Sequence, residues 1–254
     1  MKKAIYLLLL FVPTFLFAQH HHDHSGHDHS GHNHDHSGHN HNHSHGNTNP
    51  QAGIVADTVY EKSDDGITIM EVHYQSGITK ATGPLKDKVK NGRWFGYHPS
   101  GVLNSIIEYQ AGLRHGLSVV LDSRGGIISQ ENYSEGKKNG SSRIYADVRG
   151  AKVLKTHTVY KDDLLHGKKV QYTENGKLQA IAEYQNGEKH GKSSWYYSNG
   201  NPAIEQNYSK DVLNGSQISY YEDGQVRSEA NYVDGKLHGF WTEFHPNGEL
   251  KVKG

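Results

Sequence analysis

The chain has 254 residues, with 27 basic and 27 acidic side chains, so its formal charge is zero before its 21 histidines are counted. Hydrophobic residues make up only 33% of the chain. This composition excludes the large aliphatic core of Rossmann or barrel enzymes, whose sheets are buried on both faces. The balanced charge gives no electrostatic case for a nucleic-acid partner. Because the chain has no cysteine, disulfides, thiol catalysis and cysteine zinc sites are excluded as well.

Residues 1–19 have the pattern of a bacterial export signal. Two lysines form a basic start, the stretch Ala4–Phe17 is apolar, and Ala18 is a small residue before the expected cleavage point. The apolar stretch is short for a bilayer-spanning helix, and an uncleaved anchor is the alternative. We therefore expect a periplasmic or secreted protein, a monomer with no transmembrane segment after signal cleavage.

Residues 20–46 contain 13 histidines among 27 residues and no apolar side chain. Such a segment buries too little surface to offset the entropy of ordering it, so residues 20–57 are predicted to be a disordered tail and linker. An affinity tag is the alternative, but the units are degenerate and follow a natural export signal. Neutral imidazole suits Zn²⁺, Cu²⁺ or Ni²⁺, which predicts a divalent transition metal as the cofactor. The candidate metal ligands are His20, His21, His22, His24, His27, His29, His32, His34, His36, His39, His41, His43 and His45.

A repeat of 24 residues follows the tail. Aligning the chain on one recurring glycine gives intervals of 24 residues, with a single interval of 27 that is expected to hold a three-residue insertion in a loop at 146–152. A tyrosine recurs near the end of most units; we call these the closing tyrosines, and they are Tyr109, Tyr133, Tyr160, Tyr184, Tyr208 and Tyr232. The landmark glycines are Gly92, Gly116, Gly140, Gly167, Gly191, Gly215 and Gly239.

Each unit has the pattern of a β-hairpin. Asn-Gly or Asp-Gly pairs such as Asn175-Gly176 favour two-residue primed turns, in which both central residues have positive φ. Apolar residues alternate on either side, and a second glycine cluster is expected to turn the chain into the next hairpin. The predicted fold class is all-β: an elongated, open antiparallel sheet of tandem 24-residue β-hairpin repeats over residues 58–254, with about sixteen strands.

The repeats also resemble a known family. The phrases Tyr184-Gln-Asn-Gly-Glu-Lys-His-Gly191 and Tyr232-Val-Asp-Gly-Lys-Leu-His-Gly-Phe-Trp241 are similar to the MORN-repeat variant of YwqK-like antitoxin proteins. The resemblance implies repeated β-hairpins and a binding role, with antitoxin activity or membrane association as common assignments, and it supplies no catalytic residue. Asp163 and Asp211 depart from the pattern, because most units have glycine there.

Two columns of residues are alternative binding sites within the repeats. Histidine precedes four landmark glycines, at His115, His166, His190 and His238. Equivalent positions of successive units lie roughly 9–10 Å apart, and two imidazoles are not expected to share a zinc ion over that spacing. Asparagine fills the same column in other units, so a turn role is favoured. The aromatic columns are interpreted as the packed face of the sheet, with sugar stacking as the alternative and Trp94, Trp195 and Trp241 as surface candidates.

The sequence thus predicts an exported, non-enzymatic binding protein. Its tail would chelate transition metal, and its repeats would form a scaffold for a protein or cell-envelope partner. The alternative is an antitoxin-like or immunity-type protein that acts through the repeats alone.

Overall fold

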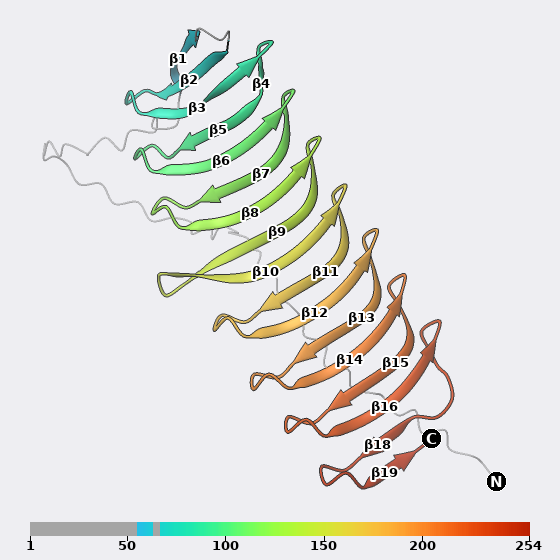
Figure 1. Ribbon diagram of the computed structural model, residues 1–254. Helices are drawn as coiled ribbons and strands as arrows, with labels where there is room; N and C mark the ends of the chain where they lie inside the picture. Colours follow the sequence, from blue (N-terminus) through green and yellow to red (C-terminus); the bar gives the residue numbers. More distant parts are fainter. Residues whose placement is uncertain (1–54, 63–66) are drawn as a thin grey trace, which may run out of the picture. The chain divides into compact units, whose positions relative to one another are not determined.

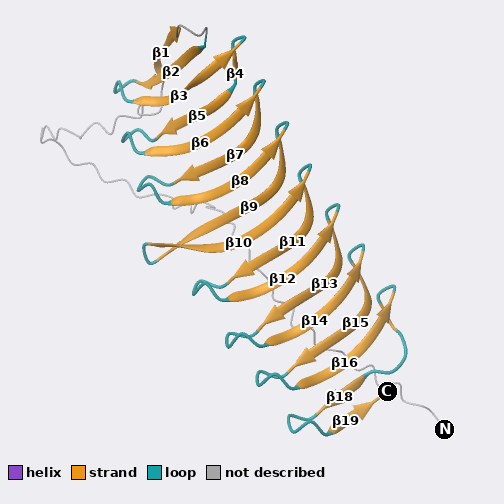
Figure 2. Ribbon diagram, in the orientation of Figure 1, coloured by secondary structure: helices purple, strands orange, loops and turns teal. Residues whose placement is uncertain are grey.

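The computed structural model describes residues 55–62 and 67–254, in which every regular element is a β-strand (Figures 1 and 2). The predicted export signal and all thirteen histidines of the tail lie outside these ranges. The described residues contain no helix with the length and hydropathy of a membrane-spanning segment. The strands are β1 (Val55–Lys62), β2 (Thr68–Tyr74), β3 (Thr79–Lys86), β4 (Val89–Lys90), β5 (Gly92–Tyr97), β6 (Leu103–Gln110), β7 (Leu113–Leu121), β8 (Ile127–Ser134), β9 (Lys137–Val148), β10 (Ala151–Lys161), β11 (Leu164–Tyr172), β12 (Leu178–Gln185), β13 (Glu188–Tyr196), β14 (Pro202–Ser209), β15 (Val212–Tyr220), β16 (Val226–Val233), β17 (Lys236–Leu237), β18 (Thr242–Phe244) and β19 (Leu250–Lys253).

The strands form one open meander. Strands that follow one another along the chain pair antiparallel, except that β4 and β5 both pair with β3, and β17 and β18 both pair with β16. Within the described residues they make one sheet of nineteen strands. The predicted all-β, repeated-hairpin fold class is confirmed. The strand number exceeds the expected sixteen in part because two strands are interrupted beside a landmark glycine. One is divided into β4 and β5, and the other into β17 and β18. In addition, β1 begins three residues ahead of residue 58.

Primed turns were predicted at pairs such as Asn175-Gly176, and this prediction was wrong. At Gly176 the glycine alone has positive φ; its N–H donates to Thr173 O (3.0 Å), while Thr173 N–H donates to Lys177 O (2.8 Å). This pattern is a type I turn closed by a glycine bulge. The primed turns lie at the opposite ends, where two successive residues have positive φ, as in Asn186 (53°) and Gly187 (92°).

Most landmark glycines lie inside strands rather than at turns; Gly92 is the first residue of β5, and Gly239 lies between β17 and β18. On β7, for example, three residues around Gly116 lie opposite the single residue Glu108 of β6. Gly116 has a φ of 83°, which glycine adopts without steric cost. The prediction that a second glycine cluster turns the chain is therefore correct for the Asn-Gly part of Asn186–Gly191 and wrong for the landmark glycine, which forms a β-bulge.

Hydrogen bonds connect each two-residue turn to the hairpin before it. The N–H of the second turn residue donates to a carbonyl just after the previous turn; Gly112 N–H donates to Lys90 O at 2.8 Å, and the same bond recurs along the sheet. Asp163 and Asp211, the departures from glycine, have positive φ (68° and 64°). Their carboxylates accept the N–H of Lys138 and Lys189, at 2.7 and 2.8 Å, which compensates for the strained backbone. The remaining bonds of this series are Gly136 to Arg114, Asp163 to Lys138, Gly187 to Leu165, Asp211 to Lys189 and Gly235 to Leu213.

The three-residue insertion lengthens a hairpin instead of forming the predicted loop at 146–152. Strands β9 and β10 continue to Val148 and from Ala151, and they are joined by a two-residue turn. Lys152 Nζ lies 2.5 Å from the Asp122 carboxylate in the preceding turn. This hydrogen bond, followed by those from Gly126 and Arg124 N–H, holds the pKa of Asp122 well below its ordinary value. Ion pairs thus connect the longer hairpin to its neighbour.

Most buried side chains lie on one face of the sheet, which we call the tyrosine face because it carries the closing tyrosines. Residues two apart share a face, and cross-strand partners extend the row. Trp94 is 3% exposed and Tyr133 is 8% exposed. Gly83 leaves room for the Trp94 indole, which a Cβ at residue 83 would approach to 2.5 Å. Small side chains occupy much of the same row: Ser118, Ser129, Ser142, Thr158, Ala180 and Ser193.

Two serines of this row provide a test of the core. Ser193 is 1% exposed and its Oγ has no partner within the described residues, whereas Ser142 Oγ donates to Glu131 at 3.2 Å. An unpartnered buried hydroxyl loses its hydration without compensation. Ser193→Ala is therefore expected to leave the free energy of unfolding unchanged or to raise it by about 1 kcal/mol. Ser142→Ala should lower it by about 1 kcal/mol. Urea unfolding followed by circular dichroism measures both, and a larger loss for Ser193→Ala would contradict this packing.

Candidate functional site

Cations cover the aromatic rings of the tyrosine face. Lys90 Nζ lies 4.2 Å from the ring centroid of Trp94 and 4.9 Å from that of Tyr109. Lys189 Nζ makes the equivalent contacts with Trp195 (5.6 Å) and Tyr208 (4.8 Å). Such contacts contribute roughly 0.5–2 kcal/mol each, more when desolvated. Because the ring faces already contact cations, the geometry favours packing over sugar stacking, and Trp94 is not a surface residue.

A charged network lies in the middle of the same face. Glu131 accepts hydrogen bonds from Tyr133 Oη (3.0 Å) and Ser142 Oγ (3.2 Å) and pairs with Lys138 Nζ (2.6 Å). Arg114 donates to Tyr133 Oη at 3.2 Å. Burial alone would raise the pKa of Glu131, but the donors, Lys138 first, outweigh it and hold that pKa below the ordinary value of 4.5. All these polar groups are partnered, so the network has the properties of a structural element.

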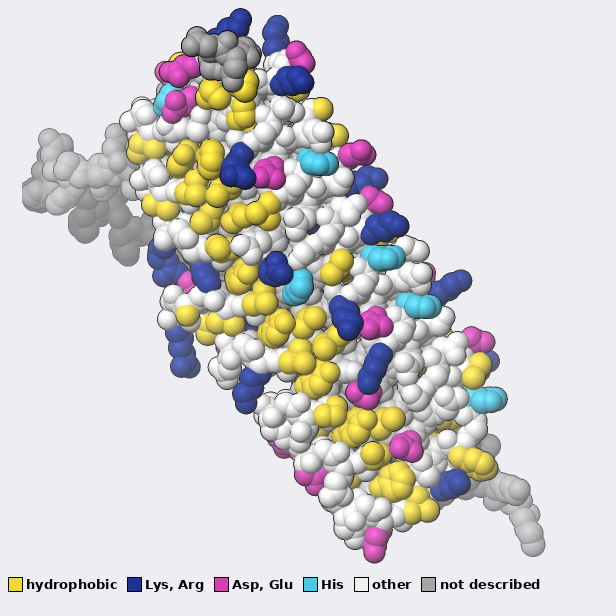
Figure 3. All heavy atoms as spheres, viewed as in Figure 1, with side chains coloured by type: hydrophobic (Ala, Val, Ile, Leu, Met, Phe, Trp, Pro, Cys, Tyr) yellow, Lys and Arg dark blue, Asp and Glu magenta, His cyan; other side chains and the backbone are white. Residues whose placement is uncertain are grey.

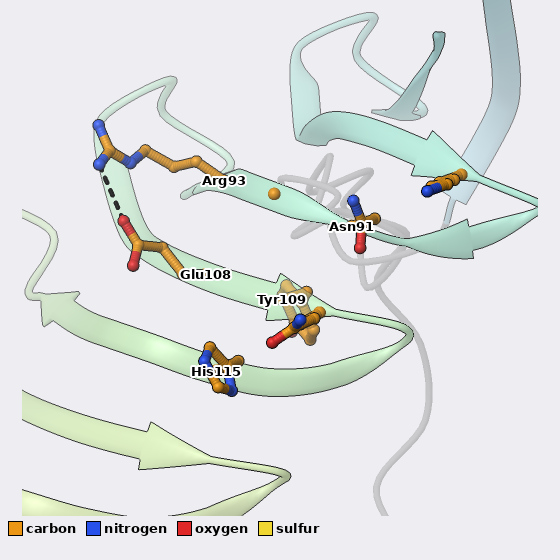
Figure 4. A pocket seen from close by; sticks show the side chains of 8 residues that line it. Asn91, Arg93, Glu108, Tyr109 and His115 are labelled. Carbon is orange, nitrogen blue, oxygen red and sulfur yellow. Dashed lines mark hydrogen bonds and ion pairs between the residues drawn. The ribbon is translucent and has the colours of Figure 1, made fainter.

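An open recess lies on the opposite face, beside the bulge of β7. Figure 4 shows Arg93 paired with Glu108 of β6, with Asn91 and His115 to either side along the sheet. Arg93 donates to Glu108 at 2.8 Å, and Leu117 N–H donates to the other carboxylate oxygen at 3.2 Å. These two bonds, in that order, lower the pKa of Glu108. The lining residues are Lys86, Asn91, Gly92, Arg93, Glu108, Tyr109, Gln110 and His115.

The column of histidines lies beside the bulges, on the long edge that carries the two-residue turns. Figure 3 shows histidine side chains along this edge. His115, His190 and His238 are exposed, and His166 is half-buried. The sequence predicted that these histidines belong to turns, whereas the structure places them beside β-bulges. Among the described residues, no group of three His, Asp or Glu side chains could hold a metal ion.

Apolar cross-strand pairs form a stripe on the face opposite the closing tyrosines. Tyr97 pairs with Leu103, and Tyr220, ten strands further along, pairs with Val226. All the members of the stripe are half-buried, and Figure 3 shows a band of hydrophobic side chains across successive strands. The sequence alternation indicated such rows, but not how accessible they are. The pairs between these two are Leu121 with Ile127, Tyr145 with Leu154, Tyr172 with Leu178 and Tyr196 with Pro202.

Comparison with known proteins identifies the repeat type. Five segments, residues 90–111, 165–186, 189–210, 213–234 and 237–254, match the family model described as MORN repeat variant. No curated protein matches the chain. The chain thus contains MORN repeats, and repeats of this type indicate a binding or scaffold role.

Solved structures add only distant likenesses. The crystal structure of TcdB2-TccC3 is 12% identical, with a TM-score of 0.24 over 75% of this chain and 10% of that chain. The crystal structure of TcdB2-TccC3-Cdc42 is 11% identical, with a TM-score of 0.22 over 75% of this chain and 14% of that chain. The chain thus spans a small part of both, and these TM-scores support no structural argument.

The Glu131 network predicts a dependence of stability on pH. Because the pKa of Glu131 is lowered on folding, its contribution is fully present above the ordinary value of 4.5 and is lost as the pH falls toward the folded pKa. Glu131→Gln should lower the free energy of unfolding at pH 7 by about 1–3 kcal/mol, because Lys138 loses its partner. It should also flatten the fall in thermal midpoint that begins as the pH drops below about 4.5.

The matched control is Glu174→Gln. Glu174 is exposed and makes no hydrogen bond or ion pair within the described residues, so the change should leave both the midpoint and its pH dependence as in the wild type. Equal pH profiles for wild type and Glu131→Gln would show that this carboxylate does not stabilise the fold.

Proposed function

We propose that the protein is an exported, non-enzymatic binding protein with two modules. The histidine-rich tail binds divalent transition metal, and the MORN repeats provide the surface for a protein or cell-envelope partner. The observation that carries the metal-binding half is the density of imidazole, 13 of 27 residues between positions 20 and 46. His-x-His spacing with intervening Gly and Ser lets one chain offer many overlapping sites of moderate affinity.

The apolar stripe supports the second half of the proposal. Exposed apolar rows larger than isolated residues are typical of interaction sites, and this stripe recurs in successive hairpins. The opposite face is occupied by its own packing, since cations cover its rings.

Metal capacity should depend on the tail and on pH. Near pH 7.5 most unperturbed imidazoles are neutral and available, whereas near pH 5 most carry protons and cannot coordinate. Calorimetric titration with Zn²⁺, Cu²⁺ and Ni²⁺ should show several ions per chain at the higher pH and a collapse at the lower one. A chain that begins at Asn47 should lose most of this capacity. If the shorter chain binds as many ions as the full one, the tail is not the metal-binding module. The alternative hypothesis, a protein that acts through its repeats alone, is then favoured.

A further inference from the structure

The Glu131 network has a counterpart two units further along the tyrosine face, and this counterpart lacks the acid. At a distance of two 24-residue units plus the three-residue insertion, Ala182 takes the place of Glu131. The three side chains that bind Glu131 recur there with their types unchanged. They are Tyr184, Lys189 and Ser193, which correspond to Tyr133, Lys138 and Ser142.

The strand register around Ala182 is the same as the register around Glu131. Ala182 of β12 pairs with Ser193 of β13. Glu131 of β8 pairs with Ser142 of β9 in the same way. In both hairpins the register then shifts at the bulge, and the closing tyrosine pairs with the lysine of the set. Because cross-strand partners lie on one face of a sheet, the second set of donors is arranged around Ala182 as the first is around Glu131.

The hydroxyl groups of the second set have no acceptor. Ser142 Oγ donates to Glu131 at 3.2 Å, whereas Ser193 Oγ is buried without a hydrogen-bond partner within the described residues. Tyr133 Oη donates to Glu131 at 3.0 Å, whereas the hydroxyl of Tyr184 makes no hydrogen bond to the part of the chain that the structure describes. Two donors that bind a carboxylate in one hairpin are thus unsatisfied in the other.

Two lysines beside Ala182 also have no carboxylate partner. Lys138 Nζ lies 2.6 Å from Glu131, whereas Lys189 forms no ion pair within residues 55–62 and 67–254. Lys169 of β11 is the other cross-strand partner of Ala182, and it forms no ion pair within the same ranges. Both lysines are half-buried. Their flexible four-carbon stems allow them to rearrange around an incoming group.

A turn carboxylate near Lys189 is common to both sets. Asp211 accepts the backbone N–H of Lys189 at 2.8 Å, as Asp163 accepts that of Lys138 at 2.7 Å. The first set binds Glu131 in the presence of this turn carboxylate. The charge of Asp211 is therefore compatible with a second carboxylate beside Lys189.

We propose that the donors around Ala182 bind a carboxylate supplied by a partner molecule. The carboxylate accepts hydrogen bonds from Ser193 and Tyr184 and pairs with Lys189, as Glu131 does within its own hairpin. Hydrogen bonds to an ionised acceptor are about twice as strong as neutral ones. The site lies on the tyrosine face, so it depends neither on the histidine-rich tail nor on the apolar stripe.

The test is a chemical-shift titration of the full-length chain with sodium acetate at pH 7.5, with sodium chloride holding the ionic strength constant. The amides of Ala182 and Ser193 should shift saturably, whereas those of Glu131 and Ser142 should not, because their site is filled. Ser193→Ala and Lys189→Leu should each weaken binding about tenfold, the usual effect of one hydrogen bond to a charged group. Lys189→Leu is expected to fold because leucine occupies the same column at positions 165 and 213.

Two further variants move the carboxylate between the hairpins. Ala182→Glu supplies it from within the chain, so it should abolish the acetate response of Ser193 and raise the thermal midpoint. Glu131→Ala is the reciprocal variant and should create an acetate response at Ser142. The absence of a saturable shift at Ala182 and Ser193 in the wild type would overturn the proposal. A response that Ser193→Ala, Lys189→Leu and Ala182→Glu leave intact would overturn it as well.

A second titration distinguishes the sources of the carboxylate. The probes are an end-blocked Ala-Glu-Ala peptide and its glutamine counterpart. Tighter binding of the glutamate peptide than of acetate would assign the site to an acidic side chain of a protein partner, and equal binding would assign it to a small free carboxylate. Binding of the glutamine peptide as tight as that of the glutamate peptide would contradict recognition of a carboxylate.

Discussion

The hydrogen bond from each two-residue turn to the hairpin before it is the interaction on which the regularity of this sheet depends. A sheet ladder alone fixes neighbouring strands, but the bond from Gly112 to Lys90, repeated at each unit, fixes neighbouring hairpins. It requires positive φ at two successive turn residues, which explains the glycine at most of these positions. Asp163 and Asp211 satisfy the same constraint by a different route, because their carboxylates accept a second hydrogen bond from the preceding hairpin. The three-residue insertion lies at the opposite end of its hairpin, where it does not break this series.

The two faces of the sheet differ in how their side chains pack. A single layer must find its core on one of its own faces. Here that face packs tyrosine and tryptophan rings against lysine and arginine, above a row of small side chains. The other face carries the apolar stripe, the recess beside Glu108 and the column of histidines.

Much of the fold could be predicted from the period, because a 24-residue spacing of glycine, tyrosine and Asn-Gly pairs admits few structures other than stacked hairpins. The turn types could not. Asn-Gly occurs at both ends of the hairpin, at Asn175-Gly176 and at Asn186-Gly187, and the register of the flanking strands decides which conformation each adopts. The charged network around Glu131 and the burial of Trp94 were also missed, because they depend on which side chains the neighbouring strands place beside these residues.

The meander brings a further consequence. Among the described residues, substantial contacts join strands that are neighbours along the chain or are separated only by the two-residue strand β4 or β17. No strand therefore pairs with one that is distant in sequence. For an all-β protein this is an unusually local topology, with a low contact order. The sheet behaves as a one-dimensional array, in which each hairpin is stabilised by the two beside it and the terminal hairpins by one. Fraying should therefore begin at the short final strands β18 and β19. Whole units could be gained or lost in evolution without rebuilding the rest, because any unit presents its neighbours with the same pair of edges.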